Sequence, residues 1–105
     1  MAQFDVHRNT NPASKKRYPL LLDIQSDLLD DLATRVVVPL AMLEERSAPS
    51  ITRLMPVLEV EGRQLTLHTA QLASVARKTL GPQVASLAVH REDIVAALDV
   101  LISGV

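Results

Sequence analysis

Residues 54–68 have the sequence Leu-Met-Pro-Val-Leu-Glu-Val-Glu-Gly-Arg-Gln-Leu-Thr-Leu-His, and they indicate which kind of fold to expect. Apolar and polar residues alternate on both sides of the connection at residues 61–63, which contains Gly62. The apolar positions that alternate are Leu58, Val60, Leu65 and Leu67. A period of two places alternate side chains on one face of a strand, and a short glycine-containing connection joins two such strands. These residues therefore predict an antiparallel hairpin.

Four further segments have the composition of short strands: residues 3–7, 18–25, 35–40 and 73–77. The third contains Val36-Val37-Val38 and stops at Pro39, and β-branched residues are enriched in strands. The loop before the second segment is rich in Asn, Pro and Ser, which favour turns. The chain up to residue 80 is therefore predicted to form a sheet.

Residues 83–102 carry the one helical pattern, which follows the break at Gly81-Pro82. Apolar residues recur there at helical spacing, and Gly104 stands where a helix would end. The stripe consists of Val84, Leu87, Ile94, Leu98 and Leu101. We predict a mainly β fold, an antiparallel sheet with one C-terminal α-helix that begins near Gln83. At 105 residues, the chain is expected to be a single domain over 1–105.

Composition excludes several classes of function. There is no cysteine, so disulfides and cysteine-based metal sites or nucleophiles are excluded. No secretory signal and no apolar run long enough for a membrane span is visible, so we expect a cytoplasmic protein without membrane contact. A net charge of −1 gives no general attraction to nucleic acid.

Apolar residues are in surplus at two places. Leu28-Leu29 lies in a polar segment, where two adjacent leucines cannot both easily point inward. The C-terminal turn contains more apolar residues than one helical stripe needs, namely Val100, Leu101, Ile102 and Val105. Exposed apolar surface marks an interface with a second subunit or a target, and the alternative is incidental exposure of a few aliphatic side chains.

Several segments in register resemble the CcdB family of toxins. LDIQSDLLD at 22–30 resembles the family's VDVQSDIID, and RVVVPL at 35–40 resembles RMVIPL. LMPVL at 54–58 resembles LYPVV, and TAQLASV at 69–75 resembles TTDMASV. The opening Gln3-Phe4 and the ending Gly104-Val105 also match. The resemblance covers nearly the whole chain.

The resemblance implies a fold, a mode of action and several partners. Members have an SH3-like barrel with a C-terminal helix and form symmetric homodimers. They are toxins of type II toxin–antitoxin systems, which serve in plasmid maintenance, and they are DNA gyrase inhibitors that bind the A subunit and trap it on cleaved DNA. A CcdA-like antitoxin neutralises them. The toxin–antitoxin complex represses transcription of its own genes, so contact with DNA is only indirect.

The family's gyrase-binding residues fall on seven positions of this chain. They are Leu28, Leu29, Asp99, Ile102, Ser103, Gly104 and Val105. Ser103 replaces a tryptophan and Ile102 replaces a phenylalanine, so the C-terminal part of the patch departs from the family. A buried interfacial tryptophan is the kind of residue that dominates binding energy. A domain that binds its antitoxin but has lost gyrase poisoning therefore remains an alternative.

The basic residues of the first loop are a candidate site for the antitoxin, because antitoxin tails in this family tend to be acidic. They are Arg8, Lys15, Lys16 and Arg17, and plain solvation of a surface turn is the alternative.

No cofactor, metal site or catalytic residue is predicted, since His7, His68 and His90 lack ligand spacing. We expect no enzyme. A MazF-like endoribonuclease is the alternative, because MazF toxins share the fold, although two aromatic residues and a negative net charge disfavour an RNA-binding groove.

Overall fold

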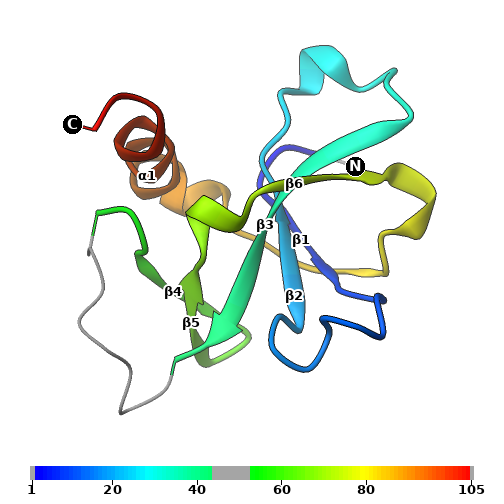
Figure 1. The fold of residues 1–105 in the computed structure, drawn as a ribbon, viewed down its shortest axis with the longest axis horizontal. Coiled ribbons are helices and arrows are strands. Elements are labelled where there is room, and N and C mark those ends of the chain that lie inside the picture. Colours follow the sequence, from blue (N-terminus) through cyan, green and yellow to red (C-terminus); the bar gives the residue numbers. More distant parts are fainter. Residues whose placement is uncertain (1, 44–52, 105) are drawn as a thin grey trace.

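The computed structural model describes residues 2–43 and 53–104, which form a curled antiparallel sheet shaped as half of a barrel, with one helix at its C-terminal end (Figure 1). The predicted mainly β fold is confirmed. The elements are β1 (Asp5–Arg8), β2 (Leu20–Asp23), η1 (Asp27–Leu29), β3 (Thr34–Met42), β4 (Val57–Val60), β5 (Arg63–Leu67), η2 (Thr69–Gln71), β6 (Ala73–Ala76), η3 (Arg77–Thr79), β7 (Gln83–Ser86), η4 (Ala88–His90) and α1 (Arg91–Ser103). The η elements are single turns of 3₁₀-helix.

Strand β3 is the longest strand in the described residues, and it organises the sheet. It pairs with β2 along one edge, and its other edge is shared by β6 near its start and β5 near its end. The strand order is β4-β5-β3-β2-β1-β7, with β6 attached to β3 beside β5. The apolar run Val36-Val37-Val38 predicted a strand here, and β3 confirms it, but the predicted stop at Pro39 is wrong, because β3 continues to Met42 and Pro39 pairs with Leu21 of β2.

One face of the sheet carries the hydrophobic core. Alternate residues of the strands point into it, and α1 covers it with Ile94 and Ala97, which are both fully buried. The sheet contributes Val6, Leu20, Leu22, Val38, Leu40, Leu58, Val60, Leu65 and Leu67. Each Å² of apolar surface that the helix and the sheet bury against each other stabilises the fold by about 25 cal/mol.

The predicted hairpin is present as β4 and β5, paired from Val57↔Thr66 to Val60↔Arg63. Glu61 and Gly62 make the turn, with φ of 53° and 78°. Two successive positive φ values match the right-handed twist of the flanking strands, which is why a Gly in this turn favours a hairpin.

The predicted helix starts too early. Residues 83–86 form β7, which pairs with β1, and α1 begins only at Arg91. Gly81 brings the chain against β1, since its N–H donates to the carbonyl of Arg8 (3.2 Å) and the carbonyl of Pro82 accepts from the N–H of Arg8 (3.0 Å). The edge of β1 needs a partner for its backbone groups, and this requirement overrides the helical spacing of Val84 and Leu87. Leu87 is still buried, so its place in the core was predicted correctly.

Candidate functional site

The segment after β2 presents leucines to solvent. Leu28 is 94% exposed, Leu29 50% and Leu32 47%. Residues 26–33, which we call the leucine loop, rise from the sheet near the top of Figure 1. Ser26 caps η1, because its hydroxyl accepts a hydrogen bond from the N–H of Leu28 (3.2 Å). The surplus of apolar residues predicted at Leu28-Leu29 is therefore present as exposed surface.

A buried ion pair supports the leucine loop from below. Arg35 and Asp23 have side chains without solvent exposure, and Nη2 of Arg35 lies 2.8 Å from Oδ2 of Asp23. The guanidinium also donates to the carbonyl of Gln25 (3.3 Å), and the Gln25 amide donates to the carbonyl of Leu29 (3.0 Å). Full pairing of this kind is what a buried guanidinium requires. The loop is thereby tied to the centre of the sheet.

Asp30 connects the leucine loop to a second arginine. Its Oδ1 accepts from Nη1 of Arg35 (3.0 Å) and from Nη2 of Arg77 (2.6 Å). Arg77 is the first residue of η3, directly after β6, so one carboxylate joins β3, the leucine loop and η3. Neither Leu32 nor Arg77 was predicted as part of a site, and no spacing in the sequence indicates that Asp30 and Arg77 meet.

The end of α1 carries the other expected target residues. Ile102 is 81% exposed, and Asp99, Ser103 and Gly104 are exposed as well. The Ser103 hydroxyl donates to the carbonyl of Asp99 (2.7 Å), so it is engaged within its own helix. Gly104 ends the helix with φ of 77°, as predicted, and Val105 lies outside the described residues.

The N-terminal segment links the leucine loop to the helical region, which sequence reasoning missed. The N–H of Gln3 donates to Oδ1 of Asp27 (2.8 Å), and the carbonyl of Phe4 accepts from Leu87 (2.8 Å). The guanidinium of Arg91, the first residue of α1, lies 5.6 Å from the centre of the Phe4 ring. Residues 3 and 4 therefore touch both the leucine loop and the start of the helix. Phe4 has φ of 72°, an uncommon conformation for a bulky residue.

The four predicted antitoxin-binding residues, Arg8, Lys15, Lys16 and Arg17, are all exposed. Three of them lie in the loop between β1 and β2, and Arg8 ends β1. The loop is fastened at its base by Asn9, whose buried amide donates to the carbonyl of Tyr18 (2.8 Å) and to the hydroxyl of Ser14 (3.0 Å). Its basic residues are thus displayed on an ordered loop.

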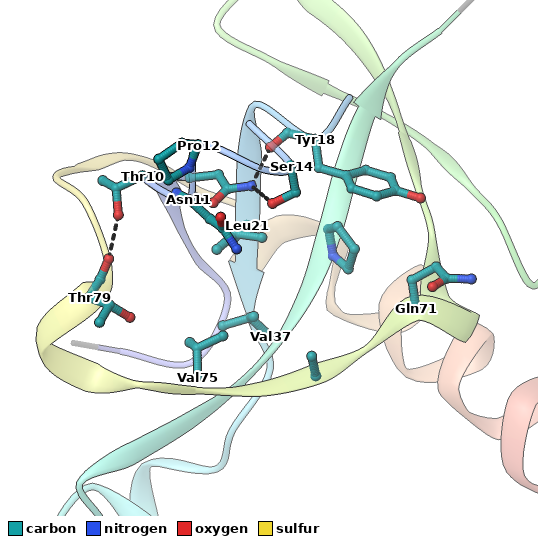
Figure 2. A pocket seen from close by; sticks show the side chains of 13 residues that line it. Thr10, Asn11, Pro12, Ser14, Tyr18, Leu21, Val37, Gln71, Val75 and Thr79 are labelled. Atoms are coloured by element: carbon teal, nitrogen blue, oxygen red, sulfur yellow. Dashed lines mark hydrogen bonds between the residues drawn. The ribbon is translucent and has the colours of Figure 1, made fainter. Parts of the chain in front are cut away.

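Behind this loop is a cavity of about 520 Å³, on the face of the sheet opposite the core. Figure 2 shows Val37 and Val75 on its floor, and Thr10 bonded across one end to the carbonyl of Thr79 (2.8 Å). The lining residues are Asn9, Thr10, Asn11, Pro12, Ser14, Tyr18, Leu21, Val37, Pro39, Gln71, Ala73, Val75 and Thr79. They come from separate segments of the chain, so sequence spacing did not reveal the cavity.

Tyr18 and His68 meet at the rim of the cavity. Their rings lie edge to face at 5.2 Å, and the guanidinium of Arg17 lies 5.3 Å from the centre of the Tyr18 ring. Burial, together with the nearby charge of Arg17, lowers the pKa of His68 below its ordinary value of 6.5. The fold therefore favours the neutral form of His68.

Metal-ligand clusters and membrane-spanning helices are both absent from the described residues. Within 2–43 and 53–104, no three His, Asp or Glu side chains gather in a way that would hold a metal ion. In the same residues, no helix is long and apolar enough to cross a membrane.

One match to a known protein family covers nearly the whole chain. It includes the leucine loop, the exposed end of the helix and the basic loop. A protein-family model described as "CcdB protein" matches residues 3–104. That match includes β1 to β7, the leucine loop and α1. The chain therefore belongs to the CcdB protein family.

Proposed function

We propose that this chain is the toxin of a type II toxin–antitoxin pair, which binds the A subunit of DNA gyrase and traps it on cleaved DNA. The observation that carries the proposal is the leucine loop. Two leucines at the family's target-contacting positions stand exposed on a loop that a fully buried ion pair fixes to the sheet. Apolar side chains held in this way enter a partner's pocket with little further ordering, which favours affinity.

The proposed action is binding without catalysis. Trapping requires only that the toxin prefers one conformation of its target, because a ligand shifts an equilibrium by its differential affinity. Leu28, Leu29 and Ile102 supply apolar contact, with Val105 as the fourth expected residue. Asp99 and Ser103 provide polar groups, and Gly104 permits close approach of the backbone. As a homodimer, the protein would present two copies of this patch to a two-fold symmetric target.

The antitoxin is proposed to bind the basic loop at Arg8, Lys15, Lys16 and Arg17. An acidic tail would meet there a cluster of exposed cations on an ordered loop. The proposed complex would then repress its own genes, so DNA is a partner only through the antitoxin.

The deciding experiment is induced expression in the native host, with and without the adjacent small reading frame. Growth arrest that the neighbour relieves supports the proposal, and normal growth in both cultures contradicts it.

Purified toxin should bind the host's gyrase A subunit. Leu28→Asp should weaken this binding at least 100-fold, about 2.7 kcal/mol, because a charge enters an apolar contact. Val57→Asp is the matched control, since Val57 is an exposed aliphatic residue on β4. Equal binding by Leu28→Asp would refute the patch.

The antitoxin-only alternative has one observation in its favour. Ser103 replaces the family's tryptophan, and its hydroxyl is bonded to its own helix. If wild type binds the antitoxin but no gyrase, while Ser103→Trp restores gyrase binding, this chain has lost poisoning through that position.

The endoribonuclease alternative has a separate test. An RNA pool should stay intact when it is incubated with the purified protein. Specific cuts that disappear in His68→Gln would instead favour the endoribonuclease.

A further inference from the structure

We propose that the cavity between residues 9–18 and β6 binds an acidic polypeptide segment by taking in one of its apolar side chains. The proposal rests on the proposed function and deepens it, since it states what the neutralising partner must contain besides negative charge. In this proposal the partner contacts β6 and η3 as well as the basic loop. Charge, shape and hydrogen-bonding groups of the cavity all bear on it.

The charge of the lining segments is one-sided. Residues 9–21 and 71–79 together contain five Lys and Arg residues and no Asp or Glu, and residues 37–39 carry no charge. Lysines flank both walls, namely Lys15 and Lys16 next to Ser14 on the loop and Lys78 next to Thr79 on η3, whereas Arg77 is already paired with Asp30. The rest of the chain is net acidic, because the whole chain has a net charge of −1. The field at this cavity therefore favours an anionic partner.

The interior of the cavity suits an apolar side chain. Leu21, Val37 and Val75 line its floor, and a volume of about 520 Å³ is within the usual range for a ligand pocket. The lining also contains amide or hydroxyl groups that can bond the N–H and C=O groups of a polypeptide backbone, those of Thr10, Asn11, Ser14, Gln71 and Thr79. The hydroxyls of Thr10 and Thr79 already donate within the chain, so toward a bound backbone they would act as acceptors.

The aromatic content favours a polypeptide over a nucleic acid. Single-stranded nucleic acid is bound largely by stacking of bases on exposed rings. Tyr18 is the chain's only tyrosine, Phe4 is buried in the core, and there is no tryptophan. The Tyr18 ring already contacts the His68 ring, edge to face, and the guanidinium of Arg17. A base would therefore have to share the one aromatic ring that lines this cavity with these two contacts.

Tyr18 provides the measurement. It is the only tyrosine in a chain without tryptophan, so the intrinsic fluorescence of the protein reports on the cavity rim. The probe is the peptide acetyl-Glu-Asp-Leu-Glu-Leu-Asp-Glu-amide, which contains no aromatic residue. One control peptide has lysine at every acidic position, and a second has serine at both leucines. Saturable binding of the acidic leucine peptide, at least tenfold tighter than either control, is expected.

Two matched pairs of variants locate the binding. Ala73 lines the cavity, whereas Ser74, the next residue of β6, does not, and both are exposed. Ala73→Leu should weaken the peptide at least tenfold by filling the cavity, and Ser74→Leu should change it less than twofold. Lys78→Glu should likewise weaken binding, whereas Arg63→Glu, on the β4–β5 hairpin, should not.

Each other outcome overturns the proposal in a distinguishable way. If both control peptides bind as well as the probe, the cavity recognises neither charge nor apolar bulk. If binding is lost in Lys15→Glu/Lys16→Glu but kept in Ala73→Leu, the basic loop serves the antitoxin as proposed and the cavity plays no part. If oligouridylate binds with the same sensitivity to Ala73→Leu and the peptide does not, the occupant is a nucleic acid.

Discussion

The leucine loop and the cavity both combine apolar surface with charge, but their shapes are opposite. The loop projects Leu28 and Leu29 outward, above a fully buried Arg35–Asp23 ion pair. The cavity keeps Leu21 and Val37 on its floor, and Lys15, Lys16 and Lys78 flank its uncharged lining residues in the sequence. A projecting apolar surface fits a pocket in a larger partner, whereas a recessed one fits a thin chain. The loop therefore depends on a few polar side chains beneath it, and the cavity depends on the sheet itself.

The largest effect is expected from breaking the support of the loop. Arg35→Met leaves the Asp23 carboxylate buried without its partner, which should lower the free energy of unfolding by about 3–5 kcal/mol. Urea unfolding measures this change. The double variant Arg35→Met/Asp23→Leu should lose clearly less, because no uncompensated charge remains. Equal losses in the single and double variants would show that the ion pair is not the main support.

A smaller effect is expected where the cavity wall is anchored. A Cβ at Gly81 would lie 2.6 Å from the backbone oxygen of Arg8, so Gly81→Ala must displace the chain beside β1. Forcing extra volume into a packed region costs about 1–3 kcal/mol of stability. Thermal unfolding measures the loss, and peptide binding at the cavity should weaken as well. A variant as stable as wild type would contradict the tight packing of this turn.

Arg77→Ala separates order in the loop from global stability. Arg77 and Asp30 are both partly exposed, and ion pairs of this kind contribute at most about 1 kcal/mol to stability. Amide hydrogen exchange at residues 27–32 should nevertheless become faster, because Asp30 then keeps only Arg35 as its partner. Lys78→Ala is the control on the neighbouring residue. Unchanged exchange in Arg77→Ala would show that Arg35 alone orders the loop.

The smallest effect is a pH dependence at the cavity rim. Because the fold lowers the pKa of His68, the unfolded chain binds this proton more readily. The stability associated with His68 is therefore complete above its ordinary value of 6.5 and declines as pH falls through its lower folded value. Unfolding free energy should fall between pH 7 and pH 5 more in wild type than in His68→Gln. Identical slopes would exclude this contribution.

Periodicity predicted the parts of the fold that depend on local pattern. The hairpin, β3 and the helix end at Gly104 follow from alternation, β-branched residues and a glycine in the left-handed region. Residues 83–86 were predicted wrongly, because the spacing of Val84 and Leu87 suits a helix and a strand-plus-turn equally. The exposed leucines could be predicted from their neighbours. The burial of Arg35 and the cavity could not, since both depend on residues that are distant in the sequence.

Asp30 also constrains how this chain can change in evolution. Its carboxylate accepts from Arg35 on β3, beneath the leucine loop, and from Arg77, which directly follows the strand β6 that lines the cavity. A replacement at position 30 alters both regions in one mutational step, and a replacement at position 77 is felt in the loop. Among related sequences, substitutions at positions 30 and 77 should therefore co-vary, and the leucine loop and the cavity should change together.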